Sequence, residues 1–243
     1  MSLAARLVFS DVDETLIDRK SMFDFLDFYL GRRYGPAGLR RARAVRADLA
    51  EAVASGVPRE RANRRYYRAW VGEPAAAVGE AGREWFAERA REDGFWIAPV
   101  RDALAAHRAA GDRIVLVSGS FAAVVKPLAR HVGATAALCS RPEVRGGVLT
   151  GALAGAPVIG EEKRRLVRGM LGALPHVDPA RCYAYGDHVS DLPMLSEVGH
   201  PVLVGAPQLA ARLPGARVLP APTAPVDGPV LSRMFVSASG GWL

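Results

Sequence analysis

The sequence predicts an α/β fold with a central parallel sheet and an all-helical insert after the first strand. Short runs rich in Val, Ile, Leu, Tyr or Phe recur along the chain, and each ends at Gly, Ser or Asp, as buried parallel strands do. Helix-like stretches separate the later runs, which indicates βαβ units. One long stretch has no strand-like run and is dense in the helix formers Ala, Arg, Glu and Leu. A length of 243 residues suits one domain with a sizeable insert.

The predicted elements follow in chain order. Strands are expected at residues 7–10, 114–118, 137–140, 183–186 and 201–205, and helices at 100–110, 121–131 and 161–174. The adjacent glycines at the start of 146–153 predict a short hairpin appended to the core. The proline-rich stretch 214–229 predicts an irregular tail packed on the core.

The insert is predicted to be helical from about residue 21 to 92. Apolar residues from Met22 to Leu30 fall at helical spacing, and Gly31 and Gly35 are expected to stop that helix. Further breaks are expected near 56–58 and 72–74. The helix could lie on a membrane surface, but acidic residues in its first turns, Asp24 and Asp27, favour a face packed on the core.

The positive charge is concentrated in one segment. The chain carries a formal net charge of +7, and residues 19–68 hold thirteen basic and five acidic residues, so the rest is close to neutral. Such a balance raises nucleic acid, anionic membranes or anionic small molecules as partners. No nucleic-acid motif accompanies the arginines, apart from three aromatic residues that could stack on bases, Tyr66, Tyr67 and Trp70. We therefore expect no specific nucleic-acid partner.

Neither a membrane partner nor secretion is predicted. The longest stretch without charge, residues 146–160, is interrupted by five glycines and a proline and is too short to span a bilayer. Asp11 and Asp13 follow the first apolar run too early for a secretory leader, so we expect a cytoplasmic protein. Cys139 and Cys182 lie in apolar runs and are expected to be buried, reduced thiols.

Chemically capable side chains follow three predicted strands. Asp11 and Asp13 come after the first strand, Ser118 and Gly119 after the second, and Asp187 and Asp191 after the fourth, with Lys163 in the preceding helix. Each group alone is explained as well by turn or helix-cap chemistry. Together, in order, they mark the carboxyl edge of a parallel sheet, where open α/β sheets bind ligands.

The segments DVDETLI, LVSGS, Lys163 in GEEKRRL and YGDHVSDLPML resemble motifs one to four of the haloacid dehalogenase superfamily. The arrangement is similar to its phosphoserine-phosphatase-like branch (subfamily IB), which inserts a helical cap between the first two motifs. The resemblance implies a Rossmann-like three-layer core at residues 1–18 and 93–243 and a helical cap at 19–92. It spans residues 7–205.

The resemblance also implies roles for named residues. Asp11 would attack phosphorus and form an aspartyl-phosphate, and Asp13 would act as general acid and base. A Mg²⁺ cofactor would be held by the Asp11 carboxylate, the Asp13 main-chain carbonyl and the Asp187 carboxylate, with Asp191 positioning a metal-bound water. The phosphoryl oxygens would be held by Ser118, the Gly119 N–H and Lys163.

Three positions depart from the family pattern. Glu14 replaces a small residue, and His188 could reach the substrate, although solvent is favoured. Lys20 stands where phosphoserine phosphatases carry a glutamate that recognises the substrate's amino group, which disfavours phosphoserine. The expected function is a Mg²⁺-dependent phosphomonoesterase for a small phosphorylated metabolite. A phosphotransferase using the same intermediate and a phosphoserine phosphatase proper remain alternatives, and the oligomeric state is not predicted.

Overall fold

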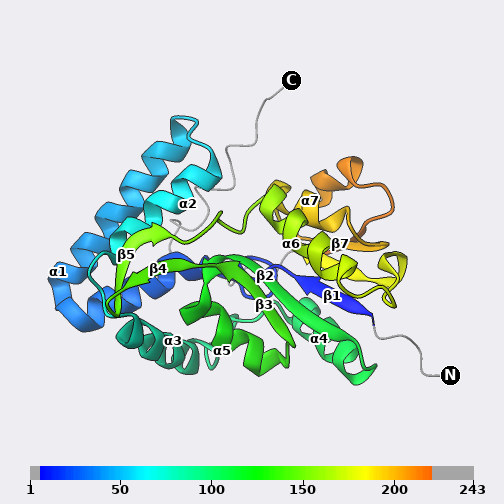
Figure 1. Ribbon diagram of the computed structural model, residues 1–243, viewed down its shortest axis with the longest axis horizontal. Helices are drawn as coiled ribbons and strands as arrows, with labels where there is room; N and C mark the ends of the chain where they lie inside the picture. The colour runs from blue at the N-terminus through cyan, green and yellow to red at the C-terminus, as the bar shows by residue number, and fades with distance from the viewer. Residues whose placement is uncertain (1–5, 221–243) are drawn as a thin grey trace.

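A six-stranded sheet forms the centre of the molecule, with the strands in the order β3-β2-β1-β6-β7-β8 (Figure 1). The computed structural model describes residues 6–220. All neighbouring strands in this sheet are parallel. Their bounds are β1 (Leu7–Ser10), β2 (Arg113–Phe121), β3 (Ala136–Ser140), β6 (Tyr183–Gly186), β7 (His200–Val204) and β8 (Arg217–Leu219). The five predicted strands and the parallel α/β class are confirmed.

The strand β8 corrects the prediction of an irregular tail. It pairs with β7 at the edge of the sheet, and residues 221–229 of the predicted tail lie outside the described residues. Only Leu219 of this strand is buried, whereas Arg217 and Val218 are exposed. A three-residue edge strand with one buried side chain leaves no periodic pattern in the sequence.

Helices cover both faces of the sheet and make a three-layer core. The helices α4 (Ala98–Ala109) and α5 (Ala122–Val132) pack on one face, and α6 (Glu161–Gly172) and the short α7 (Leu192–Leu195) on the other (Figure 1). Alternate residues of the central strands divide between the two faces, because side chains alternate along a strand. Val8, Ile114 and Leu116 contribute to the first layer, and Leu7, Phe9, Val115 and Val117 to the second.

The insert after β1 is helical, as predicted. It contains α1 (Ser21–Ala54), α2 (Arg59–Tyr67) and α3 (Ala75–Arg89), with breaks at the two predicted turns. Gly35 interrupts α1 with φ 56° and is followed by Pro36, so this stop is confirmed. Gly31 continues the helix, so that stop was wrong. Short 3-10 turns complete the described chain at Arg68–Trp70, Pro179–Arg181, Val189–Asp191 and Pro207–Arg212.

A hairpin of β4 (Pro142–Arg145) and β5 (Val148–Leu153) turns at Gly146 and Gly147. The glycine turn is as predicted, but the first strand precedes the predicted segment. The hairpin also contacts the cap: Gly72 N donates to Leu149 O and Leu149 N to Glu73 O, both at 2.9 Å. It is therefore a bridge from the core to the cap.

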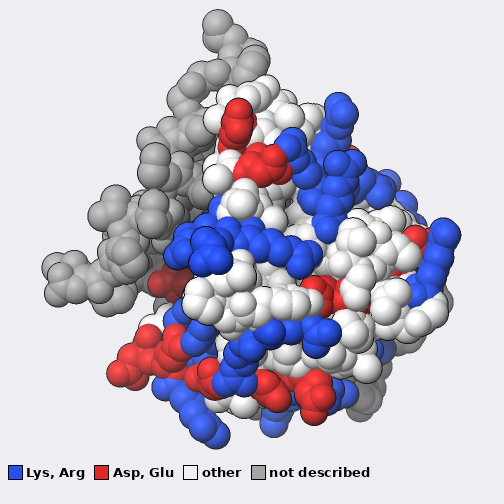
Figure 2. All heavy atoms as spheres, turned by 90° about the vertical axis from the view of Figure 1, so that its left-hand side faces the viewer, with Lys and Arg blue, Asp and Glu red and all other residues white. Residues whose placement is uncertain are grey.

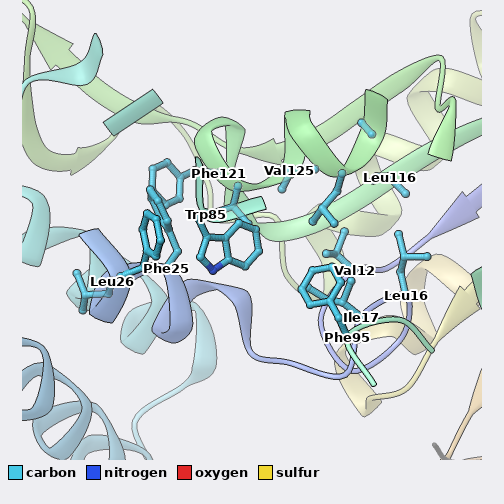
Figure 3. Close-up of a cluster of buried hydrophobic side chains, with 14 of the residues drawn as sticks. Val12, Leu16, Ile17, Phe25, Leu26, Trp85, Phe95, Leu116, Phe121 and Val125 are labelled. Carbon is cyan, nitrogen blue, oxygen red and sulfur yellow. The ribbon is translucent and has the colours of Figure 1, made fainter. Parts of the chain in front are cut away.

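The cap and the core share one hydrophobic cluster (Figure 3). Phe25 of α1 and Trp85 of α3 lie near Phe121 at the end of β2, with Phe25–Phe121 centroids 5.9 Å apart. Phe25 is fully buried, so α1 packs on the core and does not present this face to a membrane. The aromatic residues considered as a stacking platform, Tyr66, Tyr67 and Trp70, are at most 1% exposed and cannot stack on bases.

Many basic residues of the cap are paired with acidic ones. Figure 2 faces the cap end of the molecule and shows Lys and Arg side chains covering more of this surface than Asp and Glu. Arg32 lies 2.8 Å from Glu84, Arg46 lies 2.5 Å from Asp27, and Arg65 contacts Asp48. Because exposed ion pairs contribute little to stability, these contacts mainly orient the side chains.

Both cysteines are free, as expected. Cys182 is buried, but Cys139 is only half-buried, because β3 is an edge strand. Across residues 6–220, no helix combines the length and apolar character needed to cross a membrane.

Because α3 approaches α5 closely at Gly82, adding one methyl group there is predicted to destabilise the protein. A Cβ added at Gly82 would lie 2.0 Å from the Ala123 carbonyl oxygen, so Gly82→Ala must push the cap helix away. We expect a loss of about 1–3 kcal/mol in the free energy of unfolding, measured by urea denaturation. Gly79→Ala on the same helix meets nothing within 4 Å and should be neutral or stabilising by up to about 1 kcal/mol. Equal effects of the two variants would contradict this packing.

Candidate active site

The strand order brings the predicted site residues together. Because β2, β1 and β6 are neighbours in a parallel sheet, their carboxyl ends meet at one edge. Asp11 follows β1, Ser118 lies near the end of β2, and Asp187 follows β6. Residues far apart in the chain thus converge at the place where such sheets bind ligands.

Three carboxylates crowd at this edge. Oxygen atoms of Asp11, Asp187 and Asp191 all lie within 4.8 Å of one another. Burial, then the charges of Asp191 and Asp11, raise the pKa of Asp187 well above its usual range. Hard oxygen donors at this spacing, in a largely buried site, are suited to a divalent cation.

Lys163 supplies the positive charge between these groups. Its Nζ donates to Asp11 Oδ1 at 2.6 Å and to Asp191 Oδ1 at 2.7 Å, and the side chain is only 3% exposed. Burial alone would lower the pKa of Lys163, but Asp11 and Asp191 raise it above its usual range. Burial raises the pKa of Asp11, although Lys163 opposes that shift.

Asp191 is held by the protein at both carboxylate oxygens. Oδ1 accepts from Lys163, and Oδ2 accepts from the His188 N–H at 3.1 Å. Its side chain makes no capping bond to α7, which begins at the next residue, but its bond to the His188 N–H completes a capping box of the 3-10 turn Val189–Asp191. Gly186 is needed behind it, because a Cβ there would lie 2.6 Å from Asp191 Cβ.

Asp13 is half-buried and stands apart from the carboxylate cluster. Burial, then the charge of Asp11, raise the pKa of Asp13 to about 7. Its Oδ1 is buried and has no hydrogen-bond partner among the described residues. A carboxyl group with this pKa can both give and take a proton near neutral pH.

The backbone after Asp13 turns sharply. Glu14 adopts φ 60°, in the left-handed region, and its N–H donates to Ile17 O at 2.8 Å. The Glu14 side chain forms an ion pair with Lys20. The positive charge of Lys20 is therefore offset by its own neighbour.

Ser118 and Gly119 lie near the end of β2. Ser118 is 1% exposed, and its Oγ accepts from the Ser120 N–H at 3.0 Å, which leaves the hydroxyl proton free to donate. A Cβ at Gly119 would lie 3.0 Å from Ile159 Cγ1, so a side chain at this position would crowd the segment that leads into α6.

His188 has a partner from the cap, contrary to the expectation that it faces solvent. Its ring is half-buried, and Nε2 lies 2.9 Å from Arg59 Nη1. Burial, then the charge of Arg59, lower the pKa of His188 to about 4. Nδ1 lies 3.0 Å from the Ser190 nitrogen and 3.1 Å from Ser190 Oγ, so both ring nitrogens are within hydrogen-bond distance of a partner.

Comparison with known proteins identifies the family. Residues 8–196 match the family of haloacid dehalogenase-like hydrolases. The chain belongs to this family. The match contains all the site residues described above.

Relatives of this chain include proteins named as phosphatases. A probable phosphatase of Mycobacterium tuberculosis is 41% identical over 107 residues, which cover 44% of this chain and only 37% of that protein. A Streptomyces azureus protein named for inhibition of morphological differentiation is 30% identical, covering 90% of this chain and 78% of that protein. The phosphoserine phosphatase SerB1 of M. tuberculosis is 30% identical, covering 81% and 63%.

Solved structures share the fold of this chain. A protein of unknown function from Bordetella pertussis superposes with a TM-score of 0.77 at 26% identity, covering 89% of this chain and 99% of the other. A substrate-bound phosphoserine phosphatase gives a TM-score of 0.66 at 17% identity, covering 89% and 94%. The three-layer core with a helical cap is thus the architecture of the phosphoserine-phosphatase-like branch.

Four residues of the site are absent from the sequence-based prediction. Thr15 donates to Asp187 Oδ1 at 2.9 Å and lies 3.5 Å from Asp11 Oδ2, so it links two motifs. From α2, Arg59 contacts His188, and both Asn63 and Tyr67 donate to the Gly119 carbonyl. Thr15 lies within the first motif and could have been found there. Nothing in the sequence separates Arg59 from the other cap arginines.

The crowded carboxylates predict a variant of this protein that gains stability. The pKa of Asp187 is raised in the folded protein. The Asp187 carboxyl therefore stabilises the folded state at low pH, and this stabilisation is lost as pH rises. Asp187→Asn should therefore raise the free energy of unfolding at pH 7, in the presence of a chelator, by about 1 kcal/mol. The gain should shrink towards pH 4. Added divalent cation should stabilise the wild type and have little effect on the variant.

Asp112 is the matched control for this prediction. It is a buried carboxylate whose partners are Arg6, at 2.8 Å, and His107, at 2.8 Å. Although burial opposes the shift, these partners lower the pKa of Asp112, so its contribution is present near neutral pH and is lost as pH falls. Asp112→Asn should lower the free energy of unfolding by about 1–3 kcal/mol. Destabilisation by Asp187→Asn under the same conditions would contradict the charge-crowding argument.

Proposed function

We propose that this protein is a Mg²⁺-dependent phosphomonoesterase that hydrolyses a small phosphorylated metabolite through an aspartyl-phosphate on Asp11. The observation that carries the proposal is the contact between Asp11 and Lys163 at the carboxyl edge of the sheet. A buried carboxylate needs no deprotonation to act as a nucleophile, and a buried ammonium beside it attracts a phosphoryl group. The phosphatase names of its relatives support the same activity.

The acidic cluster fits Mg²⁺. We propose the Asp11 and Asp187 carboxylates and the Asp13 main-chain carbonyl as its ligands, with Asp191 fixing a bound water. Both oxygens of Asp191 already accept protein hydrogen bonds, which suits a supporting role. When bound, the cation offsets the charge of the carboxylates and of the phosphoryl oxygens. All donors in this set are oxygens, the ligand type that Mg²⁺ prefers.

The first step is proposed to use Asp11 and Asp13. An Asp11 oxygen attacks phosphorus in line, and the bond from phosphorus to the leaving-group oxygen breaks. Asp13 gives its proton to that oxygen, so the leaving group departs as an alcohol. Ser118, the Gly119 N–H and Lys163 hold the phosphoryl oxygens. A pKa near 7 suits Asp13, because the group must be protonated at this step.

The second step returns the enzyme to its starting state. The Asp13 carboxylate, having lost its proton, accepts one from water while the water oxygen attacks the acyl phosphate. The bond from phosphorus to Asp11 breaks, and inorganic phosphate and the Asp11 carboxylate are formed. Transfer to an acceptor hydroxyl would use the same groups, and it remains the alternative reaction.

The leaving group is proposed to carry a second anionic group. Arg59 Nη1 lies 2.9 Å from His188 Nε2 beside the site, and this contact engages only one of the five N–H donors of the guanidinium group. A carboxylate or phosphate oxygen of the substrate would accept from the donors that remain. Among the cap arginines, Arg59 is therefore the one proposed to recognise substrate.

Phosphoserine remains a less favoured substrate. A lysine stands where the phosphoserine phosphatases carry a glutamate for the substrate's amino group, and Lys20 pairs with Glu14. This pair cancels the charge reversal in part, because the Glu14 carboxylate lies beside the Lys20 ammonium. The names of relatives such as SerB1 keep this substrate in the test panel.

The cap boundaries at residues 19 and 92, a cytoplasmic location and the absence of a specific nucleic-acid partner stay predictions.

The first activity prediction concerns Asp11. Wild type with Mg²⁺ should release phosphate from p-nitrophenyl phosphate, and Asp11→Asn should lower kcat at least about 1,000-fold, because the amide is a poor nucleophile. Urea unfolding of the variant checks that it folds. Hydrolysis in ¹⁸O-labelled water should place the label in inorganic phosphate. Full activity of Asp11→Asn would sink the mechanism, and phosphate transferred to an added alcohol in preference to water would favour the transferase.

The second activity prediction concerns Arg59. Arg59→Gln should lower kcat/KM about tenfold or more for phosphate esters that carry a carboxylate or second phosphate, and less than about twofold for neutral esters. Arg61→Gln is the control, because Arg61 is exposed on the same helix, as Arg59 is, but Arg59 is the one that contacts His188. The measurement is steady-state phosphate release over paired anionic and neutral substrates. A loss of similar size for both substrate classes would contradict recognition by Arg59.

A further inference from the structure

One face of α2 lies over the candidate active site. Arg59, Asn63 and Tyr67 recur every four residues and so share a face of the helix. Arg59 contacts His188 after β6, and Asn63 and Tyr67 contact Gly119 at the end of β2. Arg59 is exposed, as are Arg61, Arg64 and Arg65 of the same helix, and it is the one of these that contacts His188. This helix therefore connects the cap to the end of β2 and to the loop after β6, both of which belong to the site.

The Gly119 carbonyl accepts two hydrogen bonds from the cap. Tyr67 Oη donates at 3.0 Å and Asn63 Nδ2 at 3.2 Å. Tyr67 is fully buried and Asn63 is 9% exposed, so water competes little with either donor. Burial raises the pKa of Tyr67 far above its usual range, which keeps the phenol protonated.

The peptide group between Gly119 and Ser120 also contacts Ser118, the proposed phosphate-binding residue, through its N–H. The carbonyl of Gly119 and the N–H of Ser120 belong to one planar peptide. The Ser120 N–H donates to Ser118 Oγ at 3.0 Å. The cap donors, the peptide and the Ser118 hydroxyl thus form a continuous hydrogen-bonded chain. In such a chain, each bond polarises the next, so that Ser118 becomes a better donor to an anion.

We propose that Tyr67 and Asn63 are positioning residues, through which the closed cap orients Ser118 for binding of the phosphoryl group. They touch neither the substrate phosphate nor the carboxylates, and they act through the Gly119–Ser120 peptide. By reciprocity, a phosphate held by Ser118 favours the cap position in which α2 contacts Gly119. The site would therefore be completed only when the cap is in place. This proposal rests on the proposed function for the place of the phosphoryl group.

Tyr66 supplies a matched control on the same helix. Its hydroxyl donates to the Met22 carbonyl at 2.6 Å, and the side chain is 1% exposed. Both residues of this donor and acceptor pair belong to the cap. Tyr66→Phe and Tyr67→Phe each remove one buried hydroxyl with one backbone acceptor. They should cost similar amounts of stability, which urea unfolding measures, so any difference in phosphate affinity reports the connection to Gly119.

The probe is inorganic phosphate, the product of the proposed reaction, titrated into the full chain with Mg²⁺ by calorimetry. We expect Tyr67→Phe to weaken phosphate binding about three- to tenfold and to raise the KM for p-nitrophenyl phosphate by a similar factor. Tyr66→Phe should change either value less than about twofold. Asn63→Leu, which removes the second donor, should resemble Tyr67→Phe. Equal losses for Tyr66→Phe and Tyr67→Phe would overturn the proposal.

A double-mutant cycle with Ser118→Ala tests whether Tyr67 affects phosphate binding through Ser118. If Tyr67 acts through Ser118, then Tyr67→Phe should weaken phosphate binding little further in the Ser118→Ala background. Full additivity of the two losses would overturn the proposal. Failure of the proposed function alone gives a different result. In that case the wild type binds phosphate but hydrolyses no ester, and the double-mutant cycle of phosphate binding still shows that the two losses are not additive. A wild type that binds no phosphate at all overturns both.

Discussion

The buried ammonium of Lys163 between Asp11 and Asp191 is the interaction on which the site depends. Moving a charge out of water is costly, and three carboxylates at one sheet edge would not stay ionised without compensation. Lys163 makes short contacts with two of them, at 2.6 and 2.7 Å. The third, Asp187, has only a neutral donor, Thr15, among the described residues. The cluster therefore retains an excess of negative charge, which is the electrostatic reason that a divalent cation fits it.

The sheet provides the rigid frame that this charge cluster needs. Strand β1 lies between β2 and β6, so the loops that follow these strands approach one another at a single edge. Close packing then fixes the details: Gly186 leaves room for Asp191, and Gly119 leaves room for Ile159. The cap closes the remaining side through α2. Because the cap shares its hydrophobic cluster with the core, its position is set by packing as well as by hydrogen bonds.

The sequence was most informative where function resides in short local motifs. Asp11 and Asp13 are two residues apart, as are Ser118 and Ser120. Such short spacings can be recognised in the sequence, and they predict both the carboxyl edge of the sheet and the chemistry of the side chains there. Tertiary contacts leave no such pattern. The hairpin of β4 and β5 could be predicted from its glycine turn, but its contact with the cap depends on how the cap packs. The strand β8 has one buried residue and no alternation, and Tyr67 resembles any buried aromatic residue until its hydroxyl is seen at Gly119.

The net charge of the cap indicates function less well than the contacts that each charged side chain makes. Thirteen basic residues in segment 19–68 suggest an anionic partner. In the folded cap, several of them pair with acidic residues of the same cap, and Lys20 pairs with Glu14. Arg59 differs because its guanidinium contacts His188, which follows Asp187 at the site. A cation held there can reach a bound substrate, so its position is a more specific indication of an anionic substrate than the charge of the whole cap.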